Sequence, residues 1–136
     1  MLAKTSGINA LAQAAALDNT ASSVLLVTLA DYYARNGALD QYAWFLRRLP
    51  DVPESDLYAY LQSLGTLMAN IPPVERDRGR TLLEEYARHA PRYEVRLGAY
   101  KGLVQLLPSM PALKVTLQNI REKETDDRLK AFYNLM

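Results

Sequence analysis

The side chains that could do chemistry in this chain are one histidine, several neighbouring carboxylates and a group of arginines. His89 is the only histidine among the 136 residues, so a serine nucleophile would need it as its base. It lies at the expected end of a helix, where the helix dipole favours a cation. A surface or capping role therefore explains His89 better than catalysis does.

Three pairs of neighbouring carboxylates could serve acid–base catalysis. The pairs are Glu84 with Glu85, Glu122 with Glu124, and Asp126 with Asp127. Neighbouring side chains on a helix point in different directions, so the members of each pair diverge. Solvated helix faces and charges at helix N-termini account for these acids better than catalysis. A small enzyme that uses carboxylates alone stays a poorly motivated alternative.

A basic group surrounds one expected turn between two helices. The group consists of Arg88, His89, Arg92 and Arg96. An arginine cluster at such a turn can hold a carboxylate, for example a peptide C-terminus. The alternative, which we favour, is a structural role in which these residues form ion pairs with Glu84, Glu85 and Glu94. The three arginines are nevertheless our candidates to face a substrate or partner.

The composition excludes several kinds of site. With no cysteine there is no disulfide, thiol nucleophile or thiolate metal site, and the phosphate-loop, dinucleotide and calcium-loop motifs are missing. A net charge of +1 with interspersed acids argues against nucleic acid. No apolar run approaches the ~18–20 residues of a membrane span, and no signal-peptide pattern opens the chain. We expect no cofactor or metal in this chain, and its compartment stays open.

Abundant leucine and alanine at helical spacing predict one all-α domain over residues 1–136. Prolines and capping residues divide it into helices. The expected helices cover about 6–17, 20–36, 40–49, 54–70, 73–89, 92–107, 111–122 and 126–135.

Several residues carry local predictions. Asn19 or Thr20 could cap the second helix, and Gly37 stands where a left-handed stop would end it. Gly65 inside a helix would allow a close approach of another helix. Thr125 and Asp126 are candidates to cap the last helix.

The apolar and polar faces of three helices are also predicted. In the helix at 73–89, Val74 falls on the apolar face, Arg76 falls on the water face, and Glu84 is spaced to pair with Arg88. In the last two helices, the residues expected on the apolar side are Leu113, Val115, Leu117, Ile120, Leu129, Ala131, Phe132 and Leu135.

The first, third, fifth and seventh helices begin near residues 6, 39, 73 and 111, and helix pairs at such a period indicate stacked hairpins. Segment 94–103 is echoed by 126–135, where acid, Arg, Leu, Ala, aromatic and Leu recur in register. This pattern resembles the second helix of a HEAT repeat. We predict a right-handed superhelix of about four antiparallel helical hairpins, a HEAT/ARM-like α–α solenoid. A tetratricopeptide repeat competes over 29–49, but its pattern occurs once.

Five segments together resemble a known family. They are 29–37 (LADYYARNG), 42–45 (YAWF), 60–65 (YLQSLG), 93–100 (YEVRLGAY) and 127–133 (DRLKAFY). They are similar to the C-terminal helical region of zinc aminopeptidases of the aminopeptidase N type, in the bacterial, Bacteroidetes-like branch. The resemblance implies a fragment of a larger chain that packs on the catalytic domain and helps enclose the peptide-substrate chamber. Zinc and the catalytic groups would belong to the parent enzyme, so this chain alone would not hydrolyse peptides.

A free-standing HEAT- or tetratricopeptide-like scaffold is the alternative interpretation. Such a scaffold would bind a protein or peptide partner in its concave groove. In either case the end of a helical stack exposes apolar surface, so we expect some self-association of the isolated chain.

Overall fold

The computed structural model describes residues 23–37 and 39–135, and within these ranges the chain is all-helical with no strand. The all-α part of the predicted fold class is therefore confirmed for these residues. The predicted helix at 6–17 and the capping candidates Asn19 and Thr20 lie outside the described residues.

Seven α-helices occupy the described part of the chain. They are α2 (Ser23–Asn36), α3 (Leu39–Arg48), α4 (Leu57–Met68), α5 (Asp77–His89), α6 (Tyr93–Val104), α7 (Leu113–Lys123) and α8 (Asp127–Leu135). Helices α4 and α5 begin later than predicted because 3-10 turns occupy Glu54–Asp56 and Pro73–Glu75. Each turn follows or contains a proline, whose ring restricts the residue before it.

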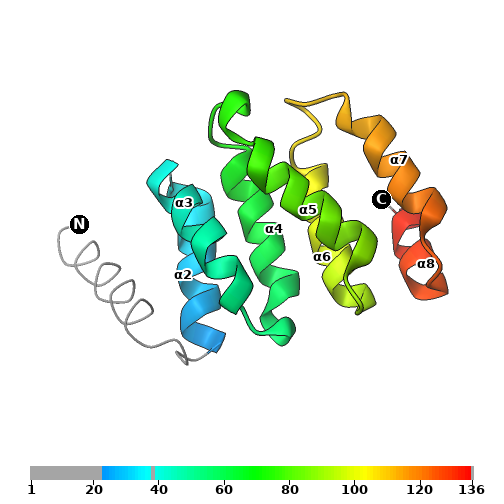
Figure 1. Ribbon diagram of the computed structural model, residues 1–136, viewed down its shortest axis with the longest axis horizontal. Coiled ribbons are helices and arrows are strands. Elements are labelled where there is room, and N and C mark those ends of the chain that lie inside the picture. The colour runs from blue at the N-terminus through cyan, green and yellow to red at the C-terminus, as the bar shows by residue number, and fades with distance from the viewer. Residues whose placement is uncertain (1–22, 38, 136) are drawn as a thin grey trace.

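Helices that alternate along the chain lie side by side (Figure 1). Helix α4 packs between α2 and α6, and α5 runs along α6. Helices α7 and α8 form the last hairpin, at the opposite end of the molecule from α2 and α3. Short connections after α3, α5 and α7 produce this order, since each one turns the chain back on itself.

Helix α4 lies at the centre of the hydrophobic core. Its fully buried side chains are Tyr60, Leu61, Leu64, Leu67 and Met68. The hydroxyl of Tyr60 donates a hydrogen bond of 2.7 Å to the carbonyl of Phe45 and so ties α4 to α3. Burying each such side chain contributes about 1.5–3 kcal/mol, so α4 contributes strongly to the stability of the stack.

Glycines bring α4 and α6 into backbone contact, as the position of Gly65 predicted. A methyl group added at Gly65 would collide with the backbone of Gly102. One added at Gly102 would lie 2.7 Å from the carbonyl oxygen of Leu61, and one at Gly98 would lie 2.6 Å from that of Tyr58. Any side chain at these positions would push the two helices apart.

Gly37 ends α2 by a different mechanism from the one predicted. No described glycine adopts a positive φ, so the expected left-handed stop is wrong. The amide of Gly37 donates to the carbonyl of Tyr33 at 2.7 Å, and a Cβ there would lie 2.9 Å from the Cβ of Gln41. Lack of space, rather than backbone conformation, favours glycine here.

The predicted faces of α5 need three corrections. Val74 lies in the 3-10 turn and is 84% exposed, because a tighter turn rotates it off the helical apolar face. Arg76 is 3% exposed instead of facing water. Glu84 pairs with Arg80 at 2.7 Å, one turn earlier than the predicted partner Arg88.

The last two helices bury fewer residues than predicted. Leu113, Leu117, Ile120 and Leu129 are buried as expected, but Val115, Ala131, Phe132 and Leu135 are exposed. Helix α8 instead buries Leu129 and Tyr133, which are four residues apart and share one face. Asp126 caps this helix as predicted, since it accepts a 2.8 Å hydrogen bond from the amide of Arg128.

Candidate binding pockets

The structure divides the three candidate arginines between two pockets. Arg88 and Arg96 line a pocket of about 550 Å³ together with His89, Lys123 and Glu124. A separate pocket of about 420 Å³ contains Arg92. The predicted basic group therefore does not form a single site.

Arg96 is held in an ion pair with Glu124, an acid that was not among the predicted partners. Its Nε and one terminal nitrogen donate to the two carboxylate oxygens at 2.9 and 3.1 Å, and the two side chains are 14% and 4% exposed. Arg96 also donates to the carbonyl of Ala90 at 2.7 Å. Glu124 accepts amide hydrogen bonds from Thr125 and Asp126. The pair thus fastens α6 to the turn between α7 and α8.

The other candidates in the basic group differ in their availability. Arg88 donates to the side-chain oxygen of Asn119 at 2.7 Å, which joins α5 to α7. Arg92 forms a long 3.5 Å pair with Glu94 and keeps 57% of its side chain exposed. His89 is exposed in the last turn of α5, where the sequence placed it. Arg92 is the arginine best placed to contact a partner.

The pocket that contains Arg92 has aromatic walls. Tyr58, Tyr93 and Phe132 line it from α4, α6 and α8. The guanidinium of Arg128 lies 3.9 Å from the centre of the Tyr93 ring, and Lys101 donates to the Tyr58 hydroxyl at 2.7 Å. Such cation–aromatic contacts order the rings at the edge of the pocket.

Asp126 and Arg128 form an exposed pair at the start of α8. The side-chain hydrogen bond from Arg128, at 2.9 Å, is the main cause that lowers the pKa of Asp126 to about 2. The carboxylate is therefore ionised at neutral pH and acts as a helix cap. Its role is structural, and it does not supply a general acid.

Arg76 is a structural residue that the sequence reading missed. Its guanidinium donates to the carbonyls of Ile71 and Ala69, at 2.7 and 3.2 Å, and to the hydroxyl of Ser109 at 2.6 Å. It therefore caps the C-terminal end of α4 and anchors the loop after α6, which a cation at this end of a helix favours. Burial lowers the pKa of Arg76. Only its position three residues after the Pro72-Pro73 break hinted at this role.

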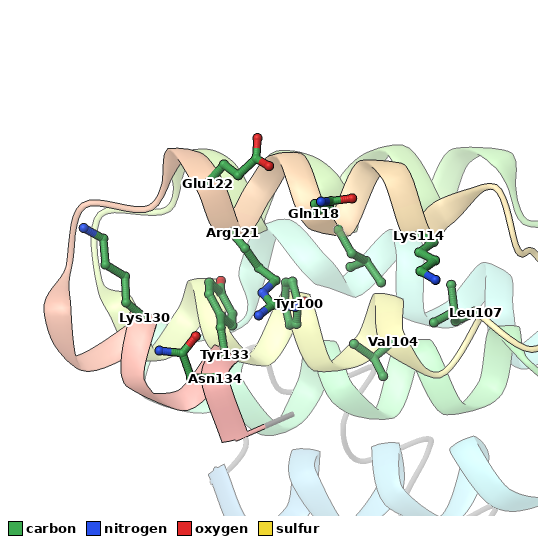
Figure 2. Close-up of a pocket in the computed structure, with 11 residues that line it drawn as sticks. Tyr100, Val104, Leu107, Lys114, Gln118, Arg121, Glu122, Lys130, Tyr133 and Asn134 are labelled. Carbon is green, nitrogen blue, oxygen red and sulfur yellow. The ribbon is translucent and has the colours of Figure 1, made fainter.

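A third pocket lies between α6, α7 and α8 and has a volume of about 740 Å³ (Figure 2). Its walls include Tyr100, Val104, Leu107, Lys114, Leu117, Gln118, Arg121, Glu122, Lys130, Tyr133 and Asn134. None of the predicted sites falls in this pocket. The repeat between 94–103 and 126–135 could have indicated this pocket. It aligns Lys130 and Asn134 of α8 with Gly98 and Gly102 of α6. Helix α8 cannot approach α6 as closely as α6 approaches α4.

Two tyrosines meet at the edge of this pocket. The rings of Tyr100 and Tyr133 lie 4.1 Å apart, and burial is the main cause that raises the pKa of both hydroxyls. The charge of Arg121 opposes both shifts. Figure 2 shows Arg121 reaching from α7 toward the two rings. The hydroxyl of Tyr133 is buried and has no hydrogen-bond partner among residues 23–37 and 39–135.

Other kinds of site are not formed by the described residues. Nowhere in 23–37 and 39–135 do three His, Cys, Asp or Glu side chains gather as a metal ion would need. None of the described helices is long and apolar enough to cross a membrane.

No family model, curated protein or solved structure matches this chain. Residues 23–37 and 39–135 thus form an all-helical fold whose pockets include the three described above.

Proposed function

We propose that this chain is a non-catalytic domain of stacked helical hairpins, with the right-handed turn of a HEAT-like superhelix, that binds a protein surface. The observation that carries the proposal is the order of the helices. The hairpins α3–α4, α5–α6 and α7–α8 follow one another, and α4 and α6 pack side by side. Repeated hairpins of this kind produce extended surfaces that bind other proteins.

The first form of the proposal makes the partner the catalytic domain of a zinc aminopeptidase in the same polypeptide. It rests on the resemblance of segments such as 29–37 and 93–100 to the helical region of that family. Zinc would then be held by the parent enzyme, and this domain would help to enclose the peptide chamber. The chain itself would supply shape and not chemistry.

This form is tested by the gene. An upstream HExxH motif followed by a distant glutamate in the same reading frame would support it. Deleting residues 23–135 from that enzyme is then expected to change which peptides it cleaves, while zinc stays bound. A native start codon at Met1 with no coding sequence upstream would refute it.

The second form is a free-standing scaffold, and exposed Arg92 beside an aromatic pocket favours it. A pulldown should recover one specific partner, and Arg92→Glu should weaken its recovery. Arg96 is unsuitable for this test because its substitution would also break the pair with Glu124. If the partner binds the Arg92 variant as well as the unchanged chain, that surface is not the binding face.

Exposed apolar side chains support the expected self-association. Val115 and Leu135 are 73% and 85% exposed on the last two helices. Sedimentation of the isolated chain is expected to show a concentration-dependent rise in mass. A monomer at all concentrations would contradict it.

A further inference from the structure

We infer that the pocket between α6, α7 and α8 binds the carboxylate end of an apolar peptide segment, with Arg121 as the residue that recognises the carboxylate. The inference rests on the proposed function, because it names the chemistry of the partner that the domain takes. Charge, apolar lining and an unpartnered hydroxyl carry it together.

The charged side chains around the pocket are mostly cationic. Lys114, Arg121 and Lys130 face a single acid, Glu122. Neither Lys114 nor Arg121 forms an ion pair with any described residue, and Lys130 has only a 3.9 Å contact with Asp127. In Figure 2 Glu122 points away from the tyrosine rings, while Arg121 points toward them. An anion is therefore the complementary ligand.

The apolar wall of the pocket selects among anions. Val104, Leu107 and Leu117 line it next to the ring of Tyr100. An inorganic anion would leave this surface uncovered, whereas an apolar side chain joined to a carboxylate would bury it. The last residue of a peptide has both groups on adjacent atoms, so it can bind the apolar wall and Arg121 at once.

Tyr133 supplies a donor that the folded chain does not use. The residue is 1% exposed and its hydroxyl finds no partner in the described part of the chain, although an unpartnered buried donor lowers stability. The exposed guanidinium of Arg121 lies beside it. A ligand oxygen that displaces Arg121 slightly would accept hydrogen bonds from both groups. A ligand oxygen in the pocket would supply the hydrogen-bond acceptor that the Tyr133 hydroxyl lacks among the described residues.

The pocket around Arg88 and Arg96 fits a carboxylate less well. Arg96 already binds both oxygens of Glu124, and Arg88 already donates to Asn119. A ligand there would have to compete with an internal carboxylate. In the pocket between α6, α7 and α8, Arg121 has no carboxylate partner among the described residues and is hydrogen-bonded to the side chain of Tyr100 instead.

Tetrapeptides test the inference directly. The probes are N-acetylated peptides ending in Leu, Phe or Val, each as a free acid and as a C-terminal amide, titrated into the isotope-labelled chain. We expect the acids to shift the amide resonances of 117–122 and 130–134 saturably, and the amides to bind at least about tenfold more weakly. Equal binding of acids and amides, or no shifts in these segments at millimolar peptide, would overturn the proposal.

Matched variants separate recognition from general charge. Arg121→Gln should weaken the acids at least about tenfold, while Lys123→Gln, which removes the same charge from the same helix outside this pocket, should change binding less than about twofold. Tyr133→Phe should weaken binding without lowering the thermal midpoint. Equal losses for Arg121→Gln and Lys123→Gln would refute the assignment of Arg121.

The outcome also distinguishes this inference from the proposed function. If the peptides fail to bind but the chain still binds a protein partner or a catalytic domain, only the peptide-binding role of this pocket is refuted. Absence of any protein partner refutes the proposed function instead.

Discussion

Helix α6 packs on two neighbours, α4 and α8, in opposite ways. Toward α4 it presents Gly98 and Gly102, and the two backbones touch. Toward α8 it presents Tyr100 and Val104, and a pocket of about 740 Å³ opens between them. The difference teaches that one sequence pattern can form either a closed contact or a binding site. Small residues at the contact give the first, and larger ones give the second.

The largest expected effect comes from disrupting the tight contact between α4 and α6. Gly102→Leu should destabilise the fold by at least about 3 kcal/mol, because the new side chain would meet the backbone of α4. The matched change on the other side is Asn134→Leu, at the equivalent exposed position of α8, which should shift stability by less than about 1 kcal/mol. Urea unfolding followed by circular dichroism measures both. Equal losses for the two variants would remove the contrast between the two contacts.

Breaking the pair between Arg96 and Glu124 should have the next largest effect. Glu124→Gln leaves a largely buried guanidinium without its carboxylate, so we expect a loss of about 3 kcal/mol. The exposed pair of Arg92 and Glu94 is the control, and Glu94→Gln should cost less than about 1 kcal/mol. The same unfolding experiment reports both values. A small loss for Glu124→Gln would mean that the last hairpin does not depend on this pair.

Two buried tyrosines sharpen the comparison, one in each region. Tyr60→Phe removes a hydrogen bond to Phe45 and should destabilise the chain by about 1 kcal/mol. Tyr133→Phe removes a buried hydroxyl that lacks a partner among the described residues and should leave stability unchanged or raise it by about 1 kcal/mol. Thermal unfolding distinguishes the two signs. A loss of stability for Tyr133→Phe would show that its hydroxyl is satisfied in solution.

The smallest effect concerns acid stability at α8. The hydrogen bond from Arg128 is the main cause that lowers the pKa of Asp126 from its usual range to about 2. Because the folded pKa lies below the unfolded one, Asp126 stabilises the fold above about pH 4 and loses this contribution as the pH falls toward 2. Asp126→Asn should flatten that part of the pH–stability curve. An unchanged curve would mean that Asp126 is not coupled to folding.

Local sequence patterns predicted most of the helices and the packing role of one glycine, Gly65. Prolines and helical spacing are local signals, so the helix bounds came within a few residues. Gly65 was identified because a glycine inside a helix needs a packing reason. The left-handed stop at Gly37 was wrong, because the lack of space beside Gln41 favours glycine there without a positive φ.

The pockets could not be predicted in the same way because they depend on partners far apart in the sequence. Arg96 finds Glu124, 28 residues later, rather than an acid on its own helix. Arg76 is buried because the loop that carries Ser109 folds over it. The pocket beside α8 arises from Lys130 and Asn134 standing in for two glycines. The difference between these residues and the glycines indicates a pocket only once the close contact between α4 and α6 is known.

Amide hydrogen exchange across α4, α6 and α8 tests the contrast between the two contacts most directly. Amides of α4 and α6 should exchange only through global unfolding, whereas those of α8 should exchange at least about 100-fold faster through local opening. Addition of a tetrapeptide free acid should slow exchange in α8. Protection of α8 equal to that of α6 in the unliganded chain would contradict the account.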